Sequence, residues 1–518
     1  MSRKVVIDPV TRIEGHLRVE VLVDDGEVKE ARSGGTLFRG FEIFLRGRDP
    51  RDAQQITQRV CGVCPISHGV ASTLCLDSAF GIADAVPKNG RILRNLILGA
   101  NFVQSHILHF YHLAALDYVD VMAVADYDGL APALNAVRDF AARGHLQPFV
   151  PRYEGDYRFD KDTNVDLVAD YVEALRVRRV AHEMLALFAG KAPHCAGLVP
   201  GGVPWRPTED KMAAFLARLN DCRRFIDNVY LPDVRAVAEV YPDYGLVGRG
   251  CGNFLAYGVF DAEDGVAEHD RRKRFLPGGS TTRELAHAAL DVGNITEDVT
   301  GSWFDGETRH PSEGETRPNA GKEGGYSWLK APRYDGRPHE VGPLARLMVA
   351  YAAGEPAVKG LLDPHLEDLG ITGADLPSVL GRHLARALET KLVADAMVDW
   401  VLQLDVDGPS AVDAEVPDEA VGYGITEAPR GALGHWVDIK GGKVANYQLV
   451  VPTTWNAGPT DGDGQPGPIE QALIGTKIRD EENPVEVVRI VRSFDPCLAC
   501  AVHVVDFAGR GRGVCRIC

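Results

Sequence analysis

Six of the ten cysteines fall in three Cys-x-x-Cys pairs, a spacing that is typical of metal ligands. The first pair is Cys61 and Cys64, and the second is Cys497 and Cys500. A Cys-x-x-Cys turn allows two thiolates to reach one metal ion, and Gly62 lets the backbone fold tightly around it. Two such turns from opposite ends of the chain would build a four-thiolate site.

From the cysteines alone, a structural zinc ion is the commoner assignment, because tetrahedral sulfur sites usually hold zinc or iron–sulfur centres. The separation of the two pairs, more than four hundred residues, argues against zinc, since structural zinc sites are mostly local. The third pair, at residues 515 and 518, is interpreted as incidental. Four isolated cysteines are expected to be buried small apolar side chains. They are Cys75, Cys195, Cys222 and Cys251.

The composition is that of an ordinary globular protein, with 45% hydrophobic and 25% charged residues in a chain of 518. The formal net charge of −17 would repel nucleic-acid phosphate, which argues against a nucleic-acid partner. No apolar run reaches the roughly 18 residues of a membrane span. The N-terminus lacks the apolar core of a signal peptide. We therefore expect a soluble chain that is exported, if at all, together with another protein.

The elements that position the two cysteine pairs can be predicted from hydrophobic periodicity. Strands are expected at 4–8, 17–23 and 27–32, and a hairpin over 437–451. Asp49-Pro50 is a good helix start, and that helix would lead directly to Cys61. Longer helices are expected at 88–118, 165–189, 209–240, 342–353 and 377–404.

A helix as long as 88–118 spans a whole domain rather than decorating one. The chain is therefore expected to have an α+β fold that is predominantly α-helical, with a long central helix bundle and small peripheral β-sheets. Residues 241–335 are rich in glycine, proline and charge, and they are expected to form a loop-rich excursion.

Longer segments around the cysteines resemble a known family. Arg59–Cys64 and Asp495–His503 are similar to the paired signatures of nickel–iron hydrogenase large subunits. Further segments agree in the family's order, and the resemblance covers essentially residues 4–503. These segments are Thr11–His16, Phe38–Glu42, His106–His112 and Ala428–Ala432.

The compact length and the segment Gln104-Ser105-His106 look closest to the selenium-containing branch of the uptake-type enzymes. That branch carries selenocysteine where this sequence has Cys497. The printed sequence therefore describes a plain sulfur site, unless this cysteine replaces a recoded residue.

The resemblance implies a site of two metals. Cys61 and Cys497 would be terminal thiolates on nickel, while Cys64 and Cys500 would bridge nickel to an iron that carries carbonyl and cyanide ligands. Thiolates are soft ligands that suit nickel, and an open position between the metals leaves room for hydrogen. The implied reaction is the reversible heterolytic cleavage of H2 to two protons and two electrons.

In that reaction Cys497 would take the proton and Glu14 would carry it outward, because burial raises the pKa of a carboxyl toward neutrality. Without the resemblance, Glu14 would be interpreted as a capping or salt-bridging residue beside Arg12. Arg430, which follows Pro429 in an Ala-Pro-Arg-Gly loop, would lie over the metals and donate to a cyanide. Since arginine does not readily give up its proton, an electrostatic role is expected.

Other residues match positions around the metals. Thr453 matches the hydroxyl that binds the second cyanide, and His68 would donate a hydrogen bond to a bridging sulfur. Asp495 would pair with Arg430 or cap a helix or turn. Many family members have an aspartate where Ser105 stands, so one carboxylate around Arg430 is missing.

Glu42 and His503 match the ligands of a buried divalent ion, which is commonly magnesium in this family. Carboxylates suit magnesium, while imidazole is an unusual ligand for it. The family's mature chain ends at the position of His503. We therefore expect residues 1–503 to form a single catalytic domain, and residues 504–518 to be a propeptide that a maturation endopeptidase removes after nickel-insertion chaperones have loaded the site.

The resemblance also implies a partner, because this chain has no spare cysteine set with iron–sulfur spacing. That partner is an iron–sulfur small subunit, which would form a heterodimer and pass electrons to a cytochrome or another acceptor. Uptake-type relatives are exported with the small subunit. The periplasm, or the periplasmic side of the membrane, is therefore the expected location, with the cytoplasm as the alternative.

Three other functions remain open at this point. A hydrogen sensor that signals through a kinase would share most of the motifs, but such sensors generally lack the cleavable tail. Non-catalytic relatives in the respiratory quinone-reducing complex lose the cysteine ligands, and all four are present here. A structural tetrathiolate zinc protein is the third alternative.

Overall fold

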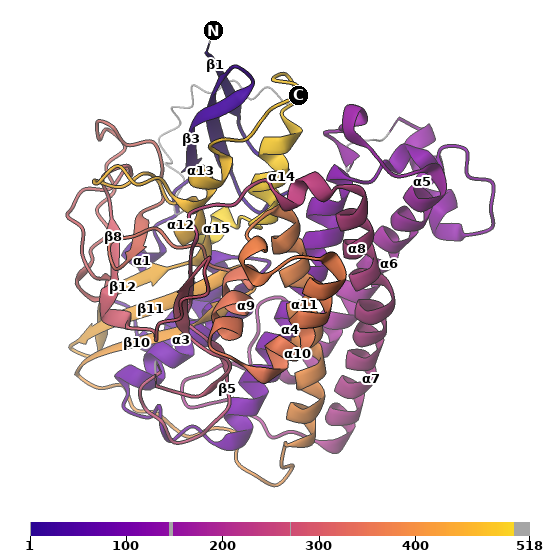
Figure 1. Cartoon of the computed structure of the whole chain (residues 1–518). Coiled ribbons are helices and arrows are strands. Elements are labelled where there is room, and N and C mark those ends of the chain that lie inside the picture. Colours follow the sequence, from indigo (N-terminus) through magenta and orange to yellow (C-terminus); the bar gives the residue numbers. More distant parts are fainter. Residues whose placement is uncertain (1, 145–148, 270, 502–518) are drawn as a thin grey trace.

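The computed structural model describes residues 2–144, 149–269 and 271–501, apart from the side chains of residues 500 and 501. A bundle of long helices lies beside a second layer of small sheets and short helices (Figure 1). This arrangement confirms the expected α+β fold with a helical bundle and small sheets. Within the described ranges, no helix is long and apolar enough to cross a membrane.

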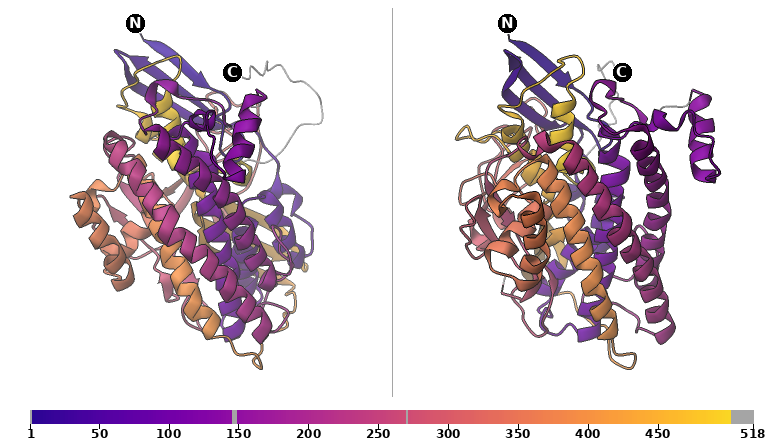
Figure 2. Two further views of the ribbon diagram at one scale, coloured as in Figure 1. Left: turned by 90° about the vertical axis from the view of Figure 1, so that its right-hand side faces the viewer. Right: turned by 45° about the vertical axis from the view of Figure 1, so that its right-hand side comes forward.

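Four long helices form the central bundle, in which the first and third both pack against the second and the fourth (Figure 2). The second of them begins where the carboxylate of Asp160 accepts a hydrogen bond from the backbone N–H of Thr163, and it ends at Gly190 with a φ of 80°. Aspartate is favoured at the N-terminal cap of a helix, and glycine is favoured where the chain leaves the C-terminus with a positive φ. The four helices are α4 (Lys88–Leu108), α6 (Lys161–Ala189), α7 (Glu209–Phe225) and α11 (Val379–Leu402).

All five predicted long helices are confirmed. Two of them are interrupted by π-helical turns, at His109–Ala114 after α4 and at Ile226–Tyr230 after α7. The sequence did not predict α5 (Pro132–Ala142), which stands away from the bundle in the right-hand view of Figure 2, or α10 (Pro356–Leu369). The remaining helices of this layer are α8 (Leu231–Val240), α9 (Pro343–Ala352) and α10 (Pro356–Leu369).

The described residues include two three-stranded antiparallel sheets. The N-terminal sheet has the order β1-β2-β3, and the second has the order β10-β11-β12. The predicted hairpin is confirmed as β11 and β12, whereas β10 was not predicted. The bounds are β1 (Arg3–Ile7), β2 (Leu17–Asp24), β3 (Glu27–Gly35), β10 (Glu419–Ala428), β11 (Gly431–Lys440) and β12 (Lys443–Val450).

The stretch 241–335 is confirmed as loop-rich, with short strands that pair two by two. These strands are β4 (Asn253–Ala256) with β7 (Gly279–Thr282), β5 (Val259–Asp261) with β6 (Arg274–Leu276), and β8 (Ile295–Asp298) with β9 (Ala331–Tyr334).

Short helices connect the sheets to the cysteine motifs. The helix predicted from Asp49 to Cys61 is present as α2 between two 3-10 turns. The others are α1 (Phe41–Phe44), α3 (Pro65–Ala79), α12 (Pro452–Ala457), α13 (Pro468–Leu473), α14 (Val485–Ser493) and α15 (Leu498–Ala501), with α2 at Ala53–Thr57.

The two ends of the described chain are paired through backbone hydrogen bonds. Val28 N–H donates to the carbonyl of Thr476 at 2.9 Å, and Gly475 N–H donates to the carbonyl of Val28 at 2.8 Å. Nearer the cysteines, Leu498 N–H donates to the carbonyl of Glu14 at 2.7 Å. The N-terminal sheet therefore brings residues 11–16 against the second cysteine motif.

Glycines allow α3 to lie directly on β10. A Cβ atom at Gly424 would lie 2.3 Å from the backbone nitrogen of Cys75 and 2.5 Å from the carbonyl oxygen of Ala71. A side chain at this position would push the helix away from the sheet. This close approach holds the first cysteine motif, at the start of α3, against the second sheet.

Gly424→Ala is therefore expected to destabilise the fold by about 1–3 kcal/mol, because the added methyl group overpacks a contact between two backbones. Urea unfolding of the purified chain measures the effect. Gly360→Ala is the matched control: this exposed helical glycine has no atom within 4 Å of an added Cβ, so alanine should stabilise by about 0.8–1 kcal/mol. Equal stability of Gly424→Ala and the parent chain would contradict the packing argument.

Candidate metal centre

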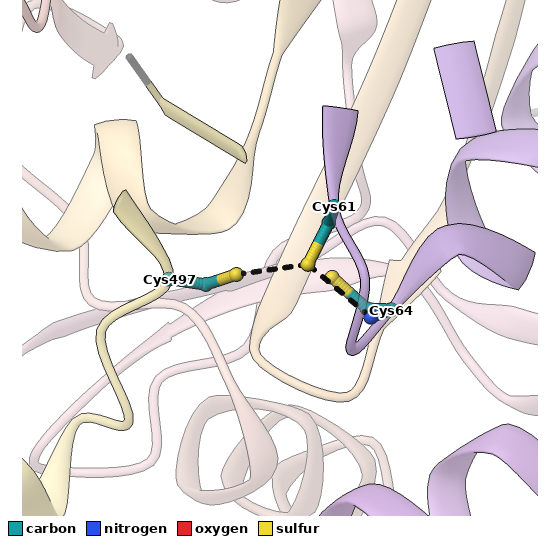
Figure 3. A group of neighbouring side chains, drawn as sticks. All are labelled: Cys61, Cys64 and Cys497. Carbon is teal, nitrogen blue, oxygen red and sulfur yellow. Dashed lines mark hydrogen bonds between the residues drawn. The ribbon is translucent and has the colours of Figure 1, made fainter. Parts of the chain in front are cut away.

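Three cysteine sulfurs converge in the interior of the protein (Figure 3). Cys61 and Cys64 lie on the turn that leads into α3, and Cys497 lies just before α15. The three sulfur atoms lie within 4.8 Å of one another, and the Sγ atoms of Cys61 and Cys497 are 3.3 Å apart. All three residues are buried. The side chain of Cys500, the fourth ligand expected from the sequence, lies outside the described part of the structure.

The turn between the first two cysteines directs backbone donors at sulfur. The N–H groups of Val63 and Cys64 donate to Sγ of Cys61 at 3.2 and 3.4 Å. Donors of this kind favour the thiolate form, which is the form that binds metals. The guanidinium of Arg39, whose role the sequence did not reveal, donates to the carbonyls of Val60 and Ala499 and so ties the two cysteine loops together.

The carboxylate of Glu14 reaches the cluster. Its Oε2 accepts hydrogen bonds from Sγ of Cys497 at 3.2 Å and from the backbone N–H of Ala499 at 2.8 Å. Burial and the negative charge of Cys61 raise the pKa of Glu14, while these two hydrogen bonds and Arg430 act in the opposite direction. Glu14 thus lies against Cys497 with a pKa above its usual value.

Arg430 lies in the tight connection between β10 and β11, buried beside the cluster. Its Nη2 donates to Oδ1 of Asp495 at 2.9 Å, and its Nη1 donates to Oγ of Ser105 at 3.3 Å. Burial alone would lower the pKa of Arg430, yet Asp495 and the nearby thiols hold it well above its usual value. The guanidinium therefore carries a fixed positive charge next to the sulfurs.

Thr453 and Pro429 make hydrogen bonds that fix the loops of Cys497 and Arg430. The backbone N–H of Cys497 donates to Oγ1 of Thr453 at 2.9 Å. The carbonyl of Pro429 accepts a hydrogen bond from Nη2 of the buried Arg346 at 2.9 Å. Since the threonine oxygen accepts here, its own hydroxyl hydrogen is left to donate elsewhere.

His68 lies on α3 one turn after Cys64, and its ring nitrogen Nδ1 is 3.3 Å from Nε2 of His435 on β11. The structure thus assigns a partner to one of its ring nitrogens that the sequence did not suggest. Burial lowers the pKa of His68 to about 4, although Cys61 acts to raise it.

Glu42 lies on α1, away from the thiols, and is buried. Its Oε1 accepts a hydrogen bond from Leu449 N–H at 2.8 Å, and its Oε2 contacts the hydroxyl of Thr316 and lies 4.0 Å from Nζ of Lys330. The other expected ligand, His503, lies outside the described residues.

The isolated cysteines lie apart from this cluster. Cys75, Cys195 and Cys222 are fully buried, as expected of small apolar side chains. Cys251 departs from the expectation, because it is only partly buried, in a loop before β4 where its thiol donates to the carbonyl of Asn253.

The donor set of the cluster fits a soft metal. The three thiols are buried together, backbone N–H groups face one sulfur, and the charge of Arg430 offsets part of the negative charge that thiolates would bring. Sulfur ligands of this kind suit nickel, zinc or iron, whereas magnesium and calcium prefer oxygen.

Comparison with known proteins decides among these metals. The model of the family described as nickel-dependent hydrogenase matches residues 39–503, and a second, described as HoxL-like, matches residues 4–34. The chain belongs to the nickel-dependent hydrogenase family. It is therefore an enzyme that acts on H2, and a structural zinc protein is no longer a reasonable alternative.

Relatives match over nearly their whole length. The periplasmic [NiFeSe] hydrogenase large subunit of Desulfomicrobium baculatum is 45% identical, with 97% of this chain and 95% of the relative covered. The quinone-reactive Ni/Fe-hydrogenase large chain of Wolinella succinogenes is 37% identical, with 98% and 97% covered. The uptake hydrogenase large subunit of Bradyrhizobium diazoefficiens is 38% identical, with 98% and 96% covered.

Solved structures show the same fold. The reduced Ni-Fe-Se hydrogenase from D. vulgaris Hildenborough aligns with a TM-score of 0.85 and 44% identity, covering 97% of this chain and 100% of that chain. These comparisons identify the chain as the catalytic large subunit of a nickel–iron hydrogenase, as its resemblance to the family implied.

Proposed function

We propose that Cys61, Cys64, Cys497 and Cys500 hold a nickel–iron pair at which H2 is cleaved heterolytically, with Cys497 and Glu14 handling the proton. The contact of 3.2 Å between Sγ of Cys497 and Oε2 of Glu14, beside the buried thiols, is the observation that carries this proposal. When bound, the metals supply the redox chemistry by taking up the two electrons of H2.

The protein's own part is to accept the proton and move it away. A Cys497 thiolate is a base beside the metals, and its contact with the carboxylate of Glu14 offers the proton a route outward. The raised pKa of Glu14 brings proton uptake and release closer to neutral pH, which suits a proton carrier. The backbone hydrogen bond from Leu498 N–H to the carbonyl of Glu14 keeps the side chains of Cys497 and Glu14 close together during proton transfer.

Arg430 and Thr453 also lie beside the cysteine cluster. The charge of Arg430, anchored by Asp495, stabilises negative charge on the thiolates and would attract the cyanide ligands that we infer for the iron. The unused hydroxyl hydrogen of Thr453 is available to donate to the second cyanide. Ser105 accepts a hydrogen bond from Arg430 but brings no charge, so Asp495 is the carboxylate that anchors the guanidinium here.

We also propose a magnesium ion at Glu42 and His503. Glu42 lies 4.0 Å from Lys330, which is itself 2.9 Å from the carboxylate of Glu297. Two buried carboxylates against one ammonium leave a net negative charge, which a divalent cation would offset.

The names of the relatives support the wider setting. Because they are large subunits, we propose an iron–sulfur small subunit as the partner that carries electrons to a cytochrome or another acceptor. The periplasmic relative supports the same compartment for this chain, with the cytoplasm as the alternative. We further propose that nickel-insertion chaperones load a single catalytic unit, residues 1–503, and that an endopeptidase then removes residues 504–518.

The test is metal analysis together with isotope exchange on the purified heterodimer. We expect one nickel and one iron per chain, little zinc, a mass that ends at His503, and exchange of H2 with deuterons of the solvent. Zinc at unit stoichiometry without exchange would refute the nickel–iron assignment. A chain of full mass without metal would show an unprocessed precursor, and exchange would then be measured after maturation.

A further inference from the structure

The short turn that carries Arg430 has a sequence that does not favour a tight hairpin. Ala428 pairs with Gly431, so Pro429 and Arg430 are the two central residues of the connection between β10 and β11. Hairpin loops of two residues favour a positive φ at the first central residue, because this matches the twist of the strands. Proline fixes φ at about −65°, and the φ of Arg430 is not positive either. The turn therefore depends on contacts from outside the hairpin.

The guanidinium of Arg346 supplies such contacts. Its Nη1 donates to the carbonyl of Ala428 at 3.0 Å, and its Nη2 donates to the carbonyl of Pro429 at 2.9 Å. Arg346 lies on α9, and this helix also begins beside the turn: a Cβ atom added at Gly342 would lie 3.1 Å from the carbonyl oxygen of Arg430. The carbonyls of three consecutive residues, 428–430, thus lie against α9.

Two carboxylates hold the guanidinium of Arg346. Its Nε and Nη2 donate to the two oxygens of Glu389 on α11 at 2.5 and 2.6 Å, and its Nη1 donates to Oε2 of Glu427 on β10 at 2.7 Å. An arginine side chain has five N–H donors, and together with the two carbonyls all five are used here. All three residues are 0% exposed, so water does not replace any of these contacts.

The side-chain contacts of Arg430 do not fix its backbone. Its Nη1 donates to Oγ of Ser105 at 3.3 Å and its Nη2 donates to Oδ1 of Asp495 at 2.9 Å, both at the far end of a long side chain. A separation of 3.3 Å is at the long limit of N–H···O hydrogen bonds, so a small shift of the turn would break the contact with Ser105. The place of the guanidinium therefore depends on what holds the turn.

We propose that Arg346 is a positioning residue for the hydrogenase reaction: by binding the carbonyls of Ala428 and Pro429, it sets the place of the Arg430 guanidinium beside the metal-binding cysteines. This inference rests on the proposed nickel–iron site. Lysine cannot take the place of Arg346, because an ammonium group has three donors and lacks the planar fork that serves two carboxylates and two carbonyls at once.

Arg346→Lys keeps a positive charge against the two carboxylates and gives up the carbonyls. Backbone amide exchange, followed by mass spectrometry on the full-length chain, should become about tenfold faster in peptides that cover residues 425–434, because two hydrogen bonds to the turn are lost. Peptides of α6 and α7 should exchange at the parent rate. Turnover in the heterodimer should fall about a hundredfold at full nickel content and unchanged KM, since a misplacement of about 1 Å costs that much.

Arg333→Lys is the matched control. Arg333 is also buried, and it donates to the carboxylate of Asp461 and to three carbonyls, those of Pro332, Pro459 and Gln465. Its contacts hold a different loop, which carries none of the site residues. Arg333→Lys should therefore speed exchange around residues 459–465 and leave both exchange at 425–434 and turnover per nickel unchanged.

Glu389→Gln provides a milder variant that does not depend on the fate of Arg346→Lys. It removes the charge that holds Nε and Nη2 of Arg346 but keeps the guanidinium and both carbonyl partners. Exchange in peptides over 425–434 should lie between the rates of the parent chain and Arg346→Lys. A parent rate at 425–434 in both variants would overturn the proposal.

A double-variant cycle shows whether Arg346 acts through Arg430. Arg430→Lys alone should lose most of the turnover, and adding Arg346→Lys should lower the remaining turnover per nickel by less than about twofold. Two effects that multiply would show that Arg346 acts independently of Arg430, and the proposal would fall. The exchange measurement needs no metal, so a parent heterodimer that binds zinc instead of nickel would refute the proposed function and leave the hold of Arg346 on the turn intact.

Discussion

Cys497→Ser is expected to lose nickel and to lower H2 oxidation more than about a thousandfold, because the redox chemistry depends on the metal and serine is a poor, hard ligand. The loss should be specific to the site. The backbone N–H of residue 497 still donates to Thr453, and the new hydroxyl can still donate to Glu14, so the loop keeps its contacts. Plasma mass spectrometry and a hydrogen-uptake assay on the purified heterodimer measure the two effects.

Cys222→Ala provides the control for this substitution. Cys222 is as deeply buried as Cys497, but it lies on α7, away from the cluster, and burial raises the pKa of its thiol to about 12. It should therefore lose some stability and keep full nickel and activity per folded chain. Unchanged nickel in Cys497→Ser would show that residue 497 is not a ligand.

The cysteine motifs could be recognised from the sequence because the two cysteines of each pair are only three residues apart. Cys61 and Cys64 share one turn, and the start of a helix is enough to present both sulfurs. Gly62 itself is not required there, because its φ is not positive and an added Cβ would meet no atom within 4 Å. The long helices were equally accessible, since α4 and α6 keep apolar residues at helical spacing over many turns.

Elements that are buried on all sides were harder to predict. Nearly every residue of α3 is buried, so the helix has no polar face to give it an amphipathic period. The strand β10 contains Gly422 and Gly424, which weaken a strand pattern although the packing against α3 requires them. Both omissions arise from tertiary contact, which a local pattern does not contain.

Contacts between distant residues were beyond the sequence for the same reason. Arg39 bridges the two cysteine loops, and His435 meets His68 across a helix and a sheet. A sequence motif can identify a ligand residue, but it does not show which distant side chains contact that residue in the fold. The contact of Glu14 with Cys497 was expected only through the resemblance to the family, because the pairing of the two chain ends creates it.

Glu14→Gln is expected to lower turnover in both directions, and exchange of H2 with solvent deuterons, by about 10²–10⁴-fold at full nickel content. Glutamine has the shape of glutamate and can still accept from Ala499 N–H, so the loop should stay in place. It cannot bind and release a proton at ordinary pH. Conversion of para- to ortho-hydrogen needs only cleavage and recombination at the site, and it should therefore persist.

This combination separates a proton carrier from a structural residue. If Glu14 only supported the loop of Cys497, Glu14→Gln would leave turnover, solvent exchange and para-to-ortho conversion unchanged, or it would lower all of them together with the nickel content. Glu14→Asp keeps the carboxyl but withdraws it by one methylene, so it should recover part of the exchange that glutamine loses. Solvent exchange at the parent rate in Glu14→Gln would show that the proton leaves Cys497 by another route, and the contact of 3.2 Å would then be structural.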